Sequence, residues 1–123
     1  MTTFHLARVY DAHEPADAMR VLADRLWPRG VSKAEAALDL WAKDVAPSTD
    51  LRHEIHGHES VTDEDYATFR AHYLAELEAN GEAVDALVAA VRGHDDVVLL
   101  TATKDPARSQ LPVLREVLVE RLG

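Results

Sequence analysis

The sequence predicts a small single α/β domain over residues 1–123, with a mainly parallel sheet of about four strands flanked by helices. Short runs typical of strands lie at both ends of the chain and in its middle, with helical patterns between them. Residues 97–102 form an apolar run, as expected for a strand buried on both faces. A chain of 123 residues with 47% hydrophobic content can form one compact core but is too short for two domains.

Four strands are expected. Residues 4–10 combine β-branched and aromatic side chains ahead of a turn-forming Asp-Ala-His-Glu-Pro sequence, and residues 19–26 are predicted to form a second strand. Leu38, Leu40 and Ala42 alternate with other residues, which predicts a third strand ending near Ala46. The fourth strand is the apolar run at 97–102.

Two helices are predicted from capping residues. Ser32 and Glu35 have the spacing of a capping box, in which a hydroxyl and a carboxylate each accept a bond from a free backbone amide, so a short helix should begin there. Ser48 is expected to cap a helix that runs to about residue 55.

Three further helices are predicted from periodicity. Apolar residues recur at helical spacing from residue 62 until Asn80-Gly81, which tolerate the backbone conformation of a helix end, and again from residue 84 to 91. A closing helix covers residues 114–122, and Pro112 must lie in its first turn or kink it.

Composition excludes several classes of function. The chain has no cysteine, so disulfides, thiol catalysis and thiolate metal sites are excluded. No apolar run approaches the ~20 residues of a membrane helix, and the N-terminus lacks the pattern of a signal peptide, so we expect a soluble cytoplasmic protein without a membrane partner. Nothing resembles a Gly-rich phosphate loop, so no cofactor is expected.

The net charge of −9 argues against a broad electrostatic contact with nucleic acid. The charge is uneven, because residues 53–96 hold eleven acidic residues against two basic ones, whereas residues 20–52 hold six basic residues against five acidic ones. The acidic stretch is expected to form the solvated faces of helices. The balanced stretch is the better place to look for a ligand site.

The segment 24–30, Asp-Arg-Leu-Trp-Pro-Arg-Gly, falls where the second strand should end. Ligands of parallel α/β sheets gather at the carboxyl ends of the strands, and residues 43–44 and 103–105 also fall where strands are predicted to end. Guanidinium groups bind carboxylate or phosphate through paired N–H donors. Arg25 and Arg29 are therefore predicted to face an anion, although Arg25 could instead pair with a carboxylate and only tie loops together.

The predicted site has two kinds of residue. The anion-binding candidates are Arg25, Arg29, Lys43 and Arg70. Asp24 and Asp44 are the candidates for orienting these cations or for transferring protons in catalysis. His53, His56 and His58 could ligate a metal, but a surface loop is the better interpretation of this stretch, so no metal is expected.

Several motifs along the chain resemble one family. They are Arg8-Val9-Tyr10-Asp11, Arg20-Val21-Leu22, the segment 24–30, Trp41-Ala42-Lys43-Asp44, Ala46-Pro47-Ser48, Leu51-Arg52, Gly57-His58, Phe69-Arg70 and Tyr73-Leu74-Ala75-Glu76-Leu77. The chain resembles the YeaO-like branch of domain of unknown function 488 over nearly its whole length. The resemblance implies a small α/β fold and brings no established activity.

Two segments depart from the pattern of that family. The histidines between Arg52 and Gly57 stand where relatives have a shorter, aromatic stretch. Arg108, Ser109 and Gln110 stand where relatives tend to have His and Asn. If that region contributes polar site groups in relatives, its role in this chain is open.

The expected function is an anion-binding crevice for a small phosphorylated or carboxylated compound. If the protein is an enzyme, acid–base or hydrolytic chemistry is expected, with basic residues stabilising negative charge in the transition state. The alternative is an accessory or regulatory binding protein without catalysis, which meets nucleic acid or another protein. The sequence leaves the oligomeric state open.

Overall fold

The computed structural model describes residues 2–11, 17–56 and 61–123. The strands are β1 (Thr3–Arg8), β2 (Met19–Leu22), β3 (Leu40–Trp41) and β4 (Asp96–Thr101). The α-helices are α1 (Lys33–Ala36), α2 (Thr49–His56), α3 (Asp63–Ala79), α4 (Gly81–Val91) and α5 (Leu111–Leu122). Two short 3-10 helices, η1 (Lys43–Val45) and η2 (Pro106–Arg108), follow β3 and β4.

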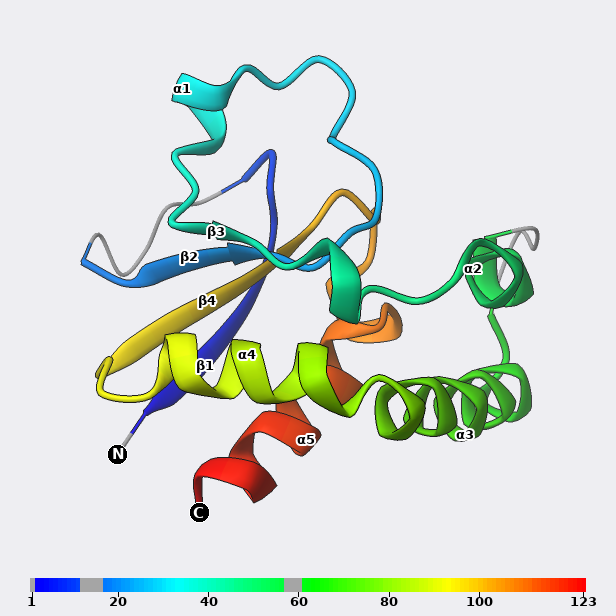
Figure 1. The fold of residues 1–123 in the computed structure, drawn as a ribbon. Helices are drawn as coiled ribbons and strands as arrows, with labels where there is room; N and C mark the ends of the chain where they lie inside the picture. Colours follow the sequence, from blue (N-terminus) through cyan, green and yellow to red (C-terminus); the bar gives the residue numbers. More distant parts are fainter. Residues whose placement is uncertain (1, 12–16, 57–60) are drawn as a thin grey trace.

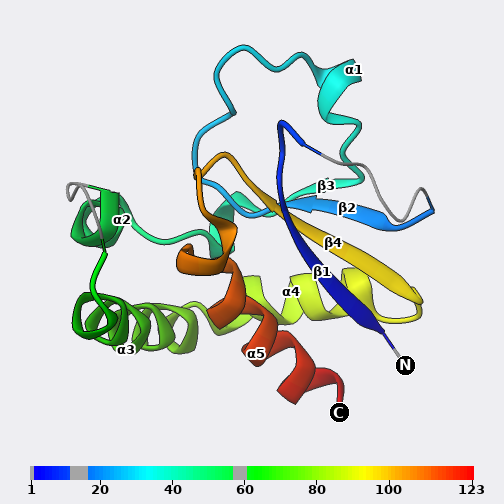
Figure 2. The same ribbon diagram turned by 180° about the vertical axis from the view of Figure 1, so that it is seen from behind.

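The strands form one parallel sheet in the order β1-β4-β2-β3, which confirms the predicted fold class (Figure 1). Helices α3, α4 and α5 lie on one side of this sheet, and α1 lies on the other with the segment that joins β2 to β3 (Figures 1 and 2). Each side has its own apolar cluster. Val97 and Leu99 of β4 belong to the cluster on the helical side, while Val98 and Leu100 belong to the opposite one.

Two strands are shorter than the sequence predicted. In β2 the Ala23 N–H still donates to the Leu100 oxygen at 3.0 Å, but the next bond to β4 joins the Ala102 N–H to the Asp24 carboxylate. At this point the Asp24 side chain, and not a backbone oxygen, accepts the hydrogen bond between the two segments. In β3 the Ala42 N–H donates to Leu22 at 2.8 Å, and the chain then turns into η1.

The helix starts predicted at Ser32, Ser48 and residue 62 are confirmed, whereas α4 and α5 begin at Gly81 and Leu111, ahead of the residues 84 and 114 that the periodicity indicated. Capping boxes begin α1 at Ser32 and α3 at Thr62, and the Ser48 hydroxyl accepts a bond from the Leu51 N–H in the first turn of α2. Pro112 lies in the first turn of α5, where a missing backbone N–H costs no helical hydrogen bond. No helix among the described residues is long and apolar enough to cross a membrane.

Candidate functional site

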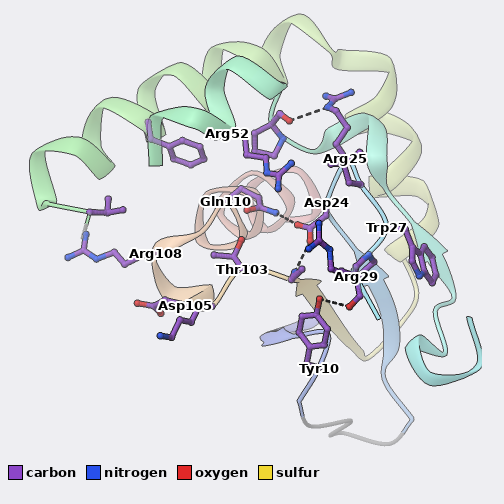
Figure 3. Close-up of a pocket in the computed structure, with 17 residues that line it drawn as sticks. Tyr10, Asp24, Arg25, Trp27, Arg29, Arg52, Thr103, Asp105, Arg108 and Gln110 are labelled. Carbon is purple, nitrogen blue, oxygen red and sulfur yellow. Dashed lines mark hydrogen bonds between the residues drawn. The ribbon is translucent and has the colours of Figure 1, made fainter. Parts of the chain in front are cut away.

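A cavity of about 1020 Å³ opens where β2 and β4 end (Figure 3). Its walls come from Tyr10 after β1, from the segments after β2 and β4, and from α2, α3 and η2. The cavity therefore occupies the edge of the parallel sheet at which ligands are expected to bind.

The side chains that line this cavity carry an excess of positive charge. Two lining residues are acidic, Asp24 and Asp105, and five are basic, namely Arg25, Arg29, Arg52, Lys104 and Arg108. The excess is notable because the whole chain has a net charge of −9. A cationic cavity in an acidic protein favours negatively charged ligands over other solutes.

Three of these basic residues differ from the other two in their contacts. The side chains of Arg29, Arg52 and Lys104 make no hydrogen bond or ion pair with any residue that the structure describes. Arg29 and Arg52 are exposed and line the cavity. Each offers the planar set of N–H donors that suits phosphate or carboxylate.

The other two arginines already have partners. Arg25 donates to the backbone oxygens of Pro47 at 3.2 Å and Ala46 at 2.8 Å, so part of its guanidinium ties the segment after β2 to the start of α2. Arg108 forms an ion pair with Asp63 and lies over the ring of Tyr66 at 5.4 Å. These two residues contribute positive charge but fewer free donors.

The carboxylate of Asp24 is bound by three donors. The Thr101 hydroxyl donates to it at 2.7 Å, the Ala102 N–H at 2.7 Å and the Gln110 amide at 2.9 Å. Thr101 and Gln110 are buried. Asp24 therefore joins the end of β2 to the end of β4 and to the start of α5.

The turn that carries Arg29 is held in place from two sides. The Val31 N–H donates to the Pro28 oxygen at 3.4 Å, and Gly30 has a φ of 78°, which favours glycine at this position. The Tyr10 hydroxyl donates to the Arg29 oxygen at 3.1 Å. Arg29 thus projects from an ordered turn at the mouth of the cavity (Figure 3).

The structure separates the predicted site residues into two groups. Asp24, Arg25 and Arg29 line the cavity together. Lys43 and Asp44 lie on η1 outside the cavity lining, and the Lys43 ammonium sits 5.2 Å from the centre of the Trp41 ring. Early termination of β3 explains this separation, because η1 carries both residues away from the ends of β2 and β4.

Arg70 also lies outside the cavity lining. It projects from α3 and forms a bidentate ion pair with Glu116 of α5, at 2.8 Å and 3.1 Å. Hydrogen bonds from Arg70 lower the pKa of Glu116 below its ordinary value. Arg70 is therefore occupied in joining two helices.

We expect Arg70→Ala to have a small effect on stability and none on any response to anions. The pair is exposed, and exposed ion pairs are weakened by salt. Thermal denaturation in low and high salt checks this, since the difference from the wild-type protein should shrink as salt increases. If Arg70→Ala lost the response to anions, the prediction would be wrong and Arg70 would belong to the binding site.

The sequence did not predict four of the polar residues that line the cavity. Arg52 was noted only as part of a family motif, and Lys104 only as a residue at a strand end. Arg108 and Gln110 fall in the segment whose role was open, and the structure answers that question for Gln110. Its amide donates to the Ala23 oxygen at 2.7 Å as well as to Asp24.

The histidine-rich stretch falls largely outside the described residues. His58 lies outside them, and of the other two only His53, which is exposed, has a described side chain. Among the residues that the structure describes, no group of three or more His, Cys, Asp or Glu side chains could hold a metal ion.

Comparison with known protein families identifies the family of the chain. A family model described as the inactive DUF488-N3 subclade matches residues 3–123, so the chain belongs to this subclade of domain of unknown function 488. The predicted family is thereby confirmed. No solved structure was found to match the chain.

Three relatives show how far the similarity extends. Uncharacterized protein YeaO of Escherichia coli is 45% identical over 111 residues, which cover 90% of this chain and 92% of that protein. Uncharacterized protein Mb3100c of Mycobacterium bovis and uncharacterized protein MT3158 of Mycobacterium tuberculosis are each 38% identical over 117 residues, which cover 95% of this chain and 94% of theirs.

Proposed function

We propose that this protein binds a small phosphorylated or carboxylated compound in the cavity at the carboxyl ends of β2 and β4, without transforming it. The observation that carries the proposal is the set of basic side chains around the cavity, three of which have no partner among the described residues. An anion bound there would accept charge-assisted hydrogen bonds from these cations.

Two observations favour binding over catalysis. A carboxylate that transfers protons must reach the ligand, whereas Asp24 already accepts three hydrogen bonds from the protein and Asp44 lies outside the cavity lining. The subclade is also described as inactive. Neither Asp24 nor Asp44, the two carboxylates considered from the sequence, is therefore placed to transfer a proton to a bound ligand.

Thermal denaturation with a panel of anions at low ionic strength tests the proposal. The panel contains phosphate, sulfate, sugar phosphates, nucleotides and carboxylates. A ligand at ~100 times its dissociation constant should stabilise the protein by about 2.7 kcal/mol. Binding of a single-stranded oligonucleotide with a steep salt dependence, and no response to small anions, would instead favour a nucleic-acid-binding function.

We expect Arg29→Ala to weaken binding of the responding anion roughly tenfold, because it removes a charge-assisted hydrogen bond. Isothermal titration calorimetry measures the change. The matched control is Arg92→Ala, which removes an exposed arginine at the end of α4, outside the cavity lining. Equal affinities of the two variants would contradict the placement of the anion beside Arg29.

A further inference from the structure

Two exposed apolar side chains lie beside the cations of the cavity. Among the described residues, the large hydrophobic side chains that remain exposed are Tyr10 at 43%, Leu26 at 62% and Val119 at 52%. Tyr10 and Leu26 both line the cavity, while Val119 lies on α5 outside its lining. Exposed apolar surface is thus concentrated at the mouth of the same cavity that gathers the basic residues.

Tyr10 has two contacts that fix its ring next to Arg29. The Tyr10 hydroxyl donates to the Arg29 backbone oxygen at 3.1 Å, and the Arg8 guanidinium lies 4.9 Å from the centre of the Tyr10 ring. Leu26 lies in the same segment 24–30, two residues before the turn that begins at Pro28. A fixed aromatic ring loses little conformational freedom when a ligand covers it, so more of the contact contributes to affinity.

The size of the cavity also exceeds the needs of a simple anion. A volume of about 1020 Å³ lies at the upper end of the range of about 300 to 1,000 Å³ in which drug-sized ligands bind. Inorganic phosphate would leave most of this space, and both apolar side chains, in contact with water. A compound that fills the cavity must therefore be larger and partly apolar.

From this arrangement we infer that the cavity binds a phosphorylated compound that carries a flat ring, the class to which nucleoside monophosphates belong. The phosphate contacts Arg29 and the neighbouring cations, and the ring covers Tyr10 and Leu26. In nucleotide-cofactor sites a Gly-rich loop binds the phosphate, and this sequence lacks such a loop. In the inferred site guanidinium groups bind the phosphate instead. The inference rests on the proposed function, because it requires that the cavity binds an anion.

Isothermal titration calorimetry with four probes tests the ring separately from the phosphate. The probes are inorganic phosphate, ribose 5-phosphate, adenosine and AMP. We expect AMP to bind about tenfold more tightly than ribose 5-phosphate, since stacking of a base on an aromatic side chain has about that effect. Adenosine should bind more weakly than AMP, because it lacks the group that contacts Arg29.

Matched variants identify the surface that the ring covers. Leu26→Ala should weaken AMP binding about fivefold and leave ribose 5-phosphate unchanged, because only the ring contacts Leu26. Val119→Ala removes the exposed apolar residue outside the cavity lining and should change neither affinity. Both positions are exposed, so neither substitution should prevent folding.

The possible results separate the inference from the proposed function. Equal affinities for AMP and ribose 5-phosphate, both weakened by Arg29→Ala, would overturn the inference and leave the anion-binding function in place. A loss of AMP affinity in Val119→Ala but not in Leu26→Ala would also overturn it. If none of the phosphorylated probes binds, the proposed function fails and the inference fails with it.

Discussion

The Asp24→Ala variant is expected to lose about 3 kcal/mol of unfolding free energy, because three donors then lose a charged acceptor. The Thr101 hydroxyl and the Gln110 amide are buried, so water replaces the carboxylate poorly. The Ala102 N–H would lose the bond that continues the sheet beyond β2. Urea denaturation measures the loss as a lower midpoint with an unchanged slope.

Asp44→Ala is the matched control for this experiment. Asp44 is an exposed acid that also follows a strand, and its carboxylate makes no hydrogen bond with a described residue. Its removal should change the unfolding free energy by less than about 0.5 kcal/mol. Similar losses for Asp24→Ala and Asp44→Ala would show that Asp24 does not join β2 to β4 as the geometry indicates.

Phe69→Ala is expected to cost about 3 to 5 kcal/mol, the range for truncating a fully buried phenylalanine. Phe69 has no exposed surface, and its ring lies 5.8 Å from that of Tyr66 and 5.7 Å from that of Tyr73. It also lines the cavity, so the floor of the proposed site is part of the main core. Urea denaturation of Phe69→Ala measures this cost.

Phe69→Leu provides the comparison for that measurement. It keeps most of the apolar volume and should cost much less, so ligand binding can be measured in a variant that remains folded. If Phe69→Ala were no less stable than Phe69→Leu, the side chain would not fill the core as described.

The sequence predicted the elements whose signals are local. A capping box located the start of α1, helical periodicity from residue 62 located α3, and the apolar run at 97–102 identified β4, because these patterns depend only on neighbouring residues. The lengths of β2 and β3 were predicted poorly. They depend on bonds between distant residues, such as that from Ala102 to Asp24, which no local pattern reveals.

The candidate site was predicted only in part, because local sequence patterns do not show which distant residues meet in the fold. The segment 24–30 could be recognised because its residues are adjacent in the chain and follow a strand. Arg52 and Arg108 come from α2 and η2, and only the folded chain places them at the same cavity. Lys43 was expected there because it falls where a strand was predicted to end, but β3 ends at Trp41 and Lys43 lies on η1, outside the cavity lining. Whether the gathered residues bind an anion stays a prediction.

Titration of the ¹⁵N-labelled protein with inorganic phosphate, followed by NMR at low ionic strength, tests the central proposal most directly. Amide signals report the position of a bound anion residue by residue, even when the natural ligand has not been identified. We expect saturable shifts at the segments 25–30 and 103–105, and we expect Arg29→Ala to reduce them. Shifts confined to residues away from the cavity, or no saturable shifts at any concentration, would contradict an anion site at the ends of β2 and β4.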